Sequence, residues 1–208
     1  MARLAVVVFN LGGPDSPEAV QPFLFNLFHD PAIIGIPQPL RWLLARLISR
    51  RRATTAQEIY GHLGGKSPLL EFTQAQSDAL AEELSGGDDV VKVFVCMRYW
   101  HPMADAVAAA VQSYAPDEIV LLPLYPQFST TTVGSSLKDW RRAAAKVGLS
   151  ASTRAACCYP VDRGWIAAQA DLVGQAVADV PDGARVLFSA HGLPRKVVDG
   201  GDPYQWQV

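Results

Sequence analysis

The chain has 208 residues, of which 50% are hydrophobic and 18% are charged, and its formal net charge is −2. This length and composition predict a globular protein with a buried core and exclude a disordered chain. The small net charge gives no reason to expect a nucleic acid partner. The three cysteines, two of them adjacent at Cys157 and Cys158, do not make a disulfide framework, which favours a reducing, cytoplasmic location.

Short apolar runs rich in valine, leucine and phenylalanine are predicted to be buried strands at residues 4–10, 90–96, 118–123, 152–156 and 185–190. From the second run onward they recur about every 30 residues, which is the length of a βαβ unit. Helical patterns occupy the intervals at residues 104–114, 135–147 and 165–178. The alternation predicts an α/β fold, with a Rossmann-like parallel sheet flanked by helices on both faces.

The interval between the first two predicted strands is much longer and predicts about four helices, at residues 17–28, 39–49, 54–62 and 68–84. An insertion of this size in an α/β fold usually supplies a lip over the substrate site. Its apolar stretch at residues 31–44 is followed by Arg50, Arg51 and Arg52. This stretch either packs inward or rests on a membrane surface with its arginines at the headgroups. No window reaches the roughly 18 apolar residues that a spanning helix needs.

The last residues predict a helix that begins near the end of the chain. Asp202 suits the N-cap position and Pro203 the first helical position. The chain stops within about two turns of this start, so we expect a truncated protein or a domain boundary inside an element.

In a parallel sheet, ligands bind beyond the carboxyl ends of the strands. The segments that follow the five predicted strands carry aromatic residues, an arginine, hydroxyl groups and a histidine, and little acid: residues 10–14, 97–102, 124–132, 157–160 and 189–192. This composition predicts a site for a large, flat, apolar ligand with anionic groups. It is not typical of a dinucleotide site.

Several common motifs are excluded. Residues 64–67 resemble the end of a phosphate-binding P-loop, but Tyr60 stands where that motif needs glycine, and a helix precedes it. Residues 10–14 lack the third glycine of a dinucleotide fingerprint. Ser189 lacks the glycine-flanked elbow of a hydrolase. The four histidines have no spacing typical of a zinc site.

His191 is the most probable chemical centre. It follows an apolar predicted strand and precedes Gly192, which allows close approach of a ligand. The alternative is a strand-end histidine satisfied by backbone groups. An imidazole can accept a proton or present a nitrogen to a divalent metal near neutral pH.

Six segments together resemble the successive signature blocks of the ferrochelatase family, in order and spacing over the whole chain: residues 10–14, Tyr60 with 64–68, 97–102, 125–129, 132–136 and 189–194. The resemblance implies the chelatase fold of two Rossmann-like halves with the porphyrin in the cleft between them. Residues 1–160 would then be the first half with its helical insertion at about 17–84, and residues 161–208 the start of the second.

The resemblance implies insertion of Fe²⁺ into protoporphyrin IX to form protohaem, the last step of haem biosynthesis. His191 matches the catalytic histidine and would also guide the metal. The matching substrate-binding positions are Leu11, Arg51, Arg52, Tyr60, Ser67, Arg98, Tyr99 and Tyr125. Arg98 and Tyr99 match positions near the metal-entry side, and Leu11 matches a residue lying against the macrocycle. Four other residues match positions that meet the propionates or the pocket mouth: Arg51, Arg52, Tyr60 and Ser67.

Three alternatives to this function stay open. The first is a closely related chelatase that acts on coproporphyrin, or on another tetrapyrrole with a metal such as Co²⁺. A second is a porphyrin- or haem-binding module without catalysis. A third is a fragment with an exposed apolar face that aggregates. Family members usually exceed 300 residues and bring an acidic partner for the histidine in their second half, so we expect this chain alone to be inactive or nearly so.

Two further expectations come from the resemblance. Some family members carry a [2Fe–2S] cluster, for which Cys157 or Cys158 would be an internal ligand, although small buried cysteines are the simpler interpretation. The helical lip allows peripheral contact with the inner face of the membrane by an otherwise cytoplasmic protein.

Overall fold

In the computed structural model, which describes residues 1–180 and 185–208, four strands form one parallel sheet. The strands are β1 (Arg3–Asn10), β2 (Val90–Met97), β3 (Glu118–Pro123) and β4 (Ser152–Ala155), and their order across the sheet is β2-β1-β3-β4. In the register, Val7 of the central strand pairs with Phe94 on one side and Leu121 on the other. The predicted parallel sheet is confirmed, with strand boundaries within one residue of those expected for the first four strands.

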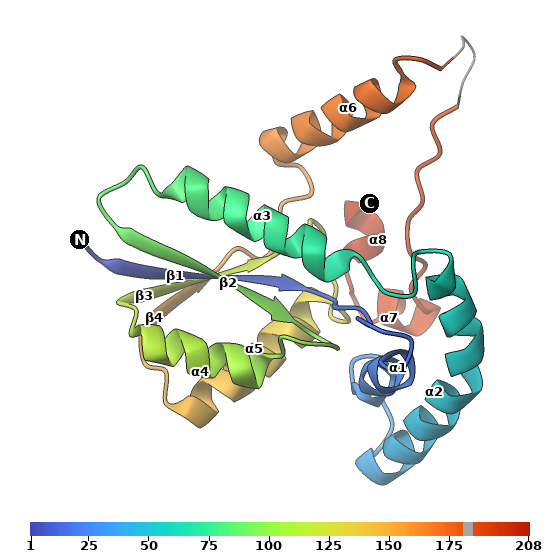
Figure 1. Ribbon diagram of the computed structural model, residues 1–208. Helices are drawn as coiled ribbons and strands as arrows, with labels where there is room; N and C mark the ends of the chain where they lie inside the picture. The colour runs from blue at the N-terminus through green and yellow to red at the C-terminus, as the bar shows by residue number, and fades with distance from the viewer. Residues whose placement is uncertain (181–184) are drawn as a thin grey trace.

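The helices are α1 (Val20–His29), α2 (Gln38–Gly61), α3 (Leu69–Leu84), α4 (Ala104–Tyr114), α5 (Val133–Val147), α6 (Arg163–Val177), α7 (Arg195–Asp199) and α8 (Tyr204–Gln207). Figure 1 shows α3 on one face of the sheet and α4 with α5 on the other. The expected helices on both faces are therefore confirmed. Helices α1 and α2 lie beyond the carboxyl ends of β1 and β2, where a substrate lip was expected.

The alternation of side chains along β1 explains why both faces are covered. Ala5, Val7 and Phe9 point into the core beneath α4 and α5, whereas Val6 and Val8 point into the core beneath α3. All five are almost completely buried. A strand that is apolar at every position can be stabilised only between two layers of helices, which is the arrangement found here.

The predicted break within the helical insertion is wrong. The helices predicted at residues 39–49 and 54–62 are one continuous helix, α2, of 24 residues, which ends at Gly61. The intervening Arg50, Arg51, Arg52 and Ala53 are good helix formers, and no glycine or proline interrupts them. A cluster of positive charge does not end a helix when its side chains reach solvent, and the three arginines are exposed.

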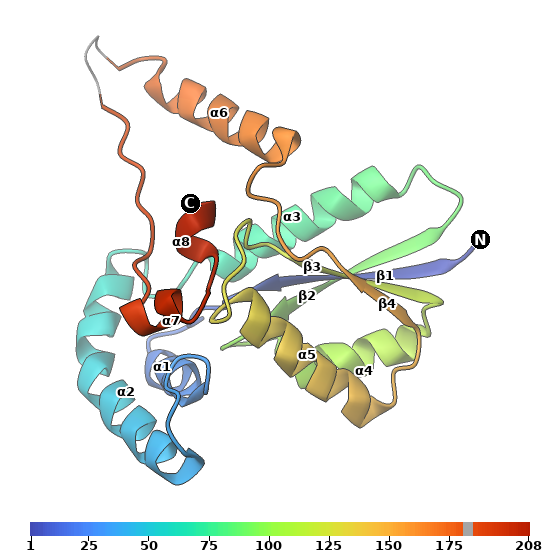
Figure 2. The ribbon, with the colours of Figure 1, turned by 180° about the vertical axis from the view of Figure 1, so that it is seen from behind.

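The prediction of buried strands fails for the last part of the chain. Residues 185–190 are extended but form no strand, and Leu187 and Phe188 are exposed. Strand β4 forms, yet all four of its residues are exposed because it is an edge strand that pairs only with β3. Figures 1 and 2 show α6 extending away from the sheet, so α6 does not cover β4. An apolar run becomes a buried strand only where a neighbouring strand and a covering layer exist.

Among the described helices, none combines the length and the apolar character needed to cross a lipid bilayer. Of the two alternatives for residues 31–44, inward packing is not met, because none of these residues is buried. In α2, Ala45 and Ser49 are buried, whereas the larger apolar side chains remain exposed: Leu40, Trp42, Leu43, Leu44 and Leu47.

Candidate functional site

The loop after β1 interlocks with the loop before α3. The backbone N–H of Ser67 donates a hydrogen bond to the carbonyl of Pro14 at 2.8 Å. A Cβ atom on Gly13 would overlap the Ser67 side chain, so glycine permits the close approach of the two loops. The amide of Asn10 adds a further tie, because its Nδ2 donates to Thr73 Oγ1 at 3.0 Å. Two predicted site residues, Leu11 and Ser67, are thereby held on neighbouring loops at the carboxyl end of the sheet.

Three predicted site residues meet in one apolar cluster beneath the lip. Leu11, Tyr60 and Tyr99 pack with apolar side chains of α1 (Val20, Phe23 and Leu24). Tyr99 is fully buried in this cluster, whereas Leu11 and Tyr60 are half-buried and keep part of their surface in solvent. Burial raises the pKa of the Tyr60 phenol above its usual value. The cluster therefore offers an apolar wall with neutral phenols, but it does not present Tyr99 directly to a ligand.

Arg98 lies in a network of buried polar groups around Asp30. Its Nη2 is 2.7 Å from Asp30 Oδ2, and its Nε donates to Ser135 Oγ at 2.7 Å. The Tyr99 hydroxyl donates to the same Asp30 oxygen at 2.8 Å, and the Ser135 hydroxyl donates to it as well. Asp139 of α5 lies 3.5 Å from Arg98 Nη1. The guanidinium is thus fixed by two carboxylates and one hydroxyl.

This network determines the protonation of its members. Burial alone would raise the pKa of Asp30, but the hydrogen bonds from Ser135 and Ala32 and the charge of Arg98 outweigh it, and the pKa is lowered. Burial and the adjacent Asp30 carboxylate raise the pKa of the Tyr99 phenol. At neutral pH the network therefore contains an ionised Asp30, a cationic Arg98 and a neutral Tyr99.

A cavity of about 520 Å³ opens beside the Arg98 network. It is lined by Arg98, which directly follows β2, by the loops after α1 and before α5, and by residues of α5 that include Lys138, Asp139 and Arg142. Its side chains carry both signs of charge. Charged side chains therefore gather at this cavity, in contrast to the apolar cluster that holds Leu11 and Tyr60.

Tyr125 follows β3 and packs against the core beneath α4 and α5. Its hydroxyl is buried and has no hydrogen-bond partner among the residues that the structure describes. Burial raises the pKa of this phenol. A buried donor without a partner is costly, so Tyr125 is one of the few polar groups here that a bound water or ligand could satisfy.

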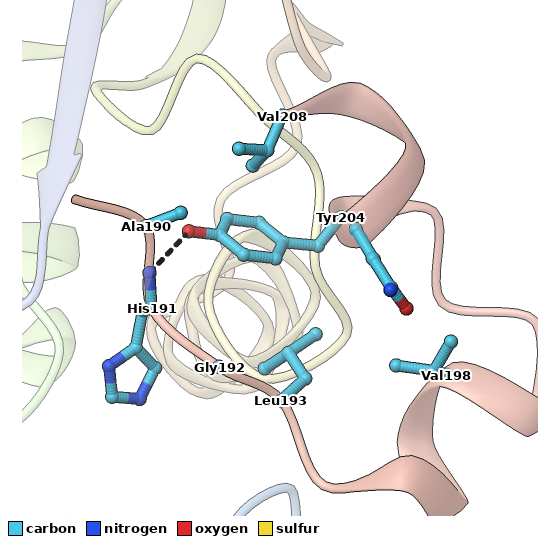
Figure 3. A pocket seen from close by; sticks show the side chains of 8 residues that line it. Ala190, His191, Gly192, Leu193, Val198, Tyr204 and Val208 are labelled. Atoms are coloured by element: carbon cyan, nitrogen blue, oxygen red, sulfur yellow. Dashed lines mark hydrogen bonds between the residues drawn. The ribbon is translucent and has the colours of Figure 1, made fainter. Parts of the chain in front are cut away.

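His191 lies in an extended segment rather than at the end of a strand. Its backbone N–H donates to the Tyr204 hydroxyl at 3.3 Å. Together with Leu193, Val198 and Val208, it lines a cavity of about 220 Å³. Figure 3 shows the imidazole directed away from the Tyr204 ring, so its two nitrogens are not used by the contact that holds its backbone.

Asp202 joins the His191 segment to the loop between β3 and α5. It is 7% exposed, and its Oδ2 accepts hydrogen bonds from the Ser129 hydroxyl at 3.0 Å and from both the N–H and the hydroxyl of Thr130, at 2.7 and 2.6 Å. Its Oδ1 accepts from the N–H of Tyr204 at 3.0 Å. A helix begins here as predicted, but one residue later than expected: Pro203 is the N-cap of α8 and Tyr204 its first residue, and the Asp202 carboxylate anchors this start.

The two remaining predicted site residues lie on α2. Arg51 and Arg52 are exposed, and the Arg52 guanidinium lies 5.7 Å from the centre of the Phe28 ring. Both are free to move toward a ligand at the lip, because neither forms an ion pair among the described residues.

Asp30 and the anchoring role of Asp202 were not predicted from the sequence. Little acid was expected at this rim, yet Asp30 is the centre of the Arg98 network. A single acidic residue before a proline, within the apolar stretch around residues 23–36, was the available signal. Asp202 contacts groups about 72 residues away, and no local pattern reports such a contact.

The described residues do not by themselves fit an iron–sulfur cluster. Such clusters use four cysteine ligands, and only Cys157 and Cys158 lie together here. Cys96 is buried in the core, and the described part of the chain contains no group of three or more metal-ligating side chains. The expectation that the adjacent cysteines are buried is also wrong, because Cys157 is exposed and Cys158 is half-buried.

Comparison with known proteins agrees with this architecture. A family model described as ferrochelatase matches residues 3–208. A ferrochelatase of Phenylobacterium zucineum is 58% identical over 210 residues, which cover 99% of this chain and 60% of the relative. Ferrochelatases of Caulobacter vibrioides and Pelagibacter ubique are 52% and 50% identical, again over 99% of this chain and 60% of the relative. The chain thus spans about 60% of the length of these relatives, and it belongs to the ferrochelatase family.

Proposed function

We propose that the protein to which this chain belongs inserts Fe²⁺ into protoporphyrin IX and so forms protohaem. The observation that carries the proposal is the ferrochelatase family match over residues 3–208, a range that includes every candidate site residue. Relatives at 50–58% identity bear the same name. Ferrous iron is here a substrate, and the protein's contribution is to bind, orient and deprotonate the porphyrin.

Metallation of a porphyrin removes two pyrrole protons and requires the ring to expose its nitrogen lone pairs. His191 is proposed to accept a proton or to guide the metal, because its ring nitrogens are not engaged by the contact that holds its backbone. Tyr204 is proposed to position it through that backbone contact. The neighbouring cavity walls from Leu193, Val198 and Val208 are apolar, which suits the face of a macrocycle.

The remaining site residues are proposed to hold the substrate. Leu11 and the half-buried Tyr60 provide an apolar wall. Arg51 and Arg52 present exposed guanidinium groups, whose paired donors match the two propionate carboxylates. Ser67 and Tyr125 add hydroxyl groups, of which that of Tyr125 lacks a partner among the described residues. Arg98, fixed by Asp30, is proposed to shape the metal-entry side rather than to contact the ring.

We also propose that residues 1–160 form the first half of a two-half chelatase and that residues 161–208 begin the second. The turn of α6 away from the sheet supports a boundary near residue 160. The exposed apolar side chains of α2, with Arg50, Arg51 and Arg52 beside them, support peripheral contact with an anionic membrane by a cytoplasmic protein.

The test compares His191→Ala with His62→Ala in the full-length protein. His62 is an exposed histidine at the end of α2 to which no role is assigned. Haem formation from Fe²⁺ and protoporphyrin IX is measured by absorbance. We expect His191→Ala to lower kcat by about 10²-fold or more, and His62→Ala to leave it unchanged. Full turnover by His191→Ala would contradict the role of His191.

A Tyr204→Phe variant tests the positioning role. We expect kcat to fall and KM for the porphyrin to stay near its parent value, because the variant removes the hydroxyl that accepts from the His191 N–H but keeps the Tyr204 ring that lines the cavity. Parallel assays with coproporphyrin, and with Co²⁺ in place of Fe²⁺, show whether the protein prefers another tetrapyrrole or another metal. A shifted porphyrin absorption band without metallation would favour the non-catalytic binding module instead.

A further inference from the structure

We propose that Cys157 and Cys158 form a two-thiol binding site for trivalent ligands of the arsenous acid class. The pair follows β4 shortly after its end and includes none of the residues proposed to act on the porphyrin. The inference is independent of the proposed function, because it rests on the geometry and surroundings of the two sulfurs.

The two sulfurs already lie at bridging distance. Their Sγ atoms are 3.2 Å apart, and the Cys157 thiol donates to the Cys158 sulfur. Bonds from sulfur to a soft ion are about 2.3 Å long, so one central atom can contact both sulfurs without moving the backbone far. Cys157 is exposed and Cys158 half-buried, which leaves a path from solvent.

The backbone on both sides of the pair is anchored to β3 and the loop that follows it. The N–H of Ala156 donates to the carbonyl of Leu121 at 2.9 Å, and the N–H of Tyr159 donates to that of Pro126 at 2.8 Å. The Tyr159 hydroxyl adds a bond to the carbonyl of Pro123 at 3.0 Å. Because the flanking residues are fixed, a ligand that joins the two sulfurs orders little additional chain.

Among the described residues the pair offers two sulfur ligands, which suits a group that two sulfurs satisfy. Zinc prefers four protein ligands in structural sites, and a [2Fe–2S] cluster also takes four. Within residues 1–180 and 185–208 there is no cluster of three metal-ligating side chains. Trivalent arsenic, in contrast, is held by two thiols with its third position kept by a hydroxyl or carbon group.

The protonation of the thiols distinguishes this chemistry from oxidation by peroxide. Partial burial of the thiol and its hydrogen bond to Cys158 raise the pKa of Cys157 to about 11. Peroxide attacks thiolates, which are scarce at neutral pH for such a group. Arsenous acid needs no free thiolate: two As–O bonds break, two As–S bonds form, and the two thiol protons leave with the hydroxyl groups as two waters. The arsenic stays trivalent, so no oxidant or reductant is required.

Gln207 of α8 completes the surroundings of the pair. Its Nε2 lies 3.9 Å from the Cys158 sulfur, while its Oε1 accepts a hydrogen bond from the N–H of Phe128 at 2.7 Å. The amide is therefore held in place beside the sulfurs. From this position it can donate to the hydroxyl that remains on a bound arsenic.

The test treats the purified protein with phenylarsine oxide, which reacts with two thiols to lose one water, and maps the product by tryptic digestion without reductant. Cleavage after arginine and lysine places both cysteines in the peptide of residues 155–163 and places Cys96 in that of residues 93–98. We expect one phenylarsenic group on the first peptide and none on the second. A small dithiol should release it, whereas an equivalent concentration of a monothiol should not.

Single variants show whether both sulfurs are needed. We expect Cys157→Ser and Cys158→Ser each to weaken binding by about 10²-fold or more, because the second bond becomes intermolecular when one thiol is missing. Cys96→Ser, which removes the core thiol, should leave binding unchanged. Labelling that persists in either Ser variant, that falls on another peptide, or that a monothiol reverses equally well would overturn the proposal. None of these results depends on chelatase activity.

Discussion

Two regions of the chain carry the same kind of apolar pattern but differ in how much of it is buried. In residues 3–147 the strands β1, β2 and β3 and the helices α4 and α5 enclose a core in which Trp140 and Phe9 are almost fully buried. In residues 152–208, β4 and α6 contain no buried residue, and Asp202 is the one buried side chain of that stretch among the residues described. An apolar run is therefore not sufficient for burial, because burial also requires neighbours on every side.

The two regions also use charge differently. In the first, Asp30 and Arg98 form a buried ion pair supported by hydroxyl groups. In the second, Asp202 accepts four hydrogen bonds from neutral donors and takes part in no ion pair among the residues that the structure describes. The first arrangement fixes the interior of the site, and the second fastens the segment that carries His191 to the loop after β3.

The largest expected contrast is between an aromatic side chain of the core and one of the exposed segment. Trp140 is 2% exposed and packs edge-to-face on Phe9, with ring centres 5.9 Å apart. We expect Trp140→Ala to lower the free energy of unfolding by about 3–5 kcal/mol, because it leaves a cavity in a covered core. Phe188→Ala, at a residue 89% exposed, should change it by less than about 0.5 kcal/mol. Urea unfolding measures both, and equal losses would contradict the contrast.

A similar effect is expected from the buried ion pair. Asp30→Ala leaves Arg98, Tyr99 and Ser135 without their shared acceptor, and we expect a loss of about 3–5 kcal/mol. The matched control is Asp105→Ala, which breaks an exposed ion pair with Arg142 and should cost about 0–1 kcal/mol. If both variants unfold at the same urea concentration as the parent, the network does not stabilise the fold.

A smaller, local effect is expected at the anchor of α8. Asp202→Ala leaves the Ser129 hydroxyl and the Thr130 N–H without their acceptor, at a cost of about 1–3 kcal/mol. Amide hydrogen exchange at Thr130 and Tyr204 should become about tenfold faster or more. Asp199→Ala, which removes only an exposed contact with Arg195, should leave these rates unchanged. Unaltered exchange in Asp202→Ala would show that other contacts hold α8.

The smallest expected effect is the acid dependence of the Asp30 network. Its pKa is lowered in the folded state, so its contribution is complete above the reference value of 3.8 and is lost as pH falls below that value toward the folded pKa. The parent should therefore lose stability more steeply below pH 3.8 than Asp30→Asn does. Other carboxylates titrate in both proteins and cancel in the difference. Parallel curves would assign the acid sensitivity to groups other than Asp30.

For the site, as for the fold, local features could be predicted from the sequence, whereas contacts between distant residues could not. The blocks that contain Leu11, Ser67, Arg98 and Tyr125 could be found from sequence, because they directly follow predicted strands or glycine-rich turns. The structure brings Leu11, Tyr60 and Tyr99 into one cluster, although they are far apart in the chain. The partners of Arg98 could not be predicted, since Asp30 and Ser135 are 68 and 37 residues away. The single helix α2 was predicted as two helices, although the residues between them, Arg50 to Ala53, are good helix formers.

The sequence by itself determined the parallel α/β architecture, the covered strands β1 to β3 and the position of the candidate blocks at strand ends. It could do so because alternation, helix periodicity and turn residues act over a few neighbouring positions. The tertiary structure alone decided that residues 185–190 stay unpaired, that Asp30 holds Arg98 and that Asp202 fastens α8. These outcomes depend on which distant groups are present to accept a hydrogen bond or to cover a surface, and no local pattern contains that information.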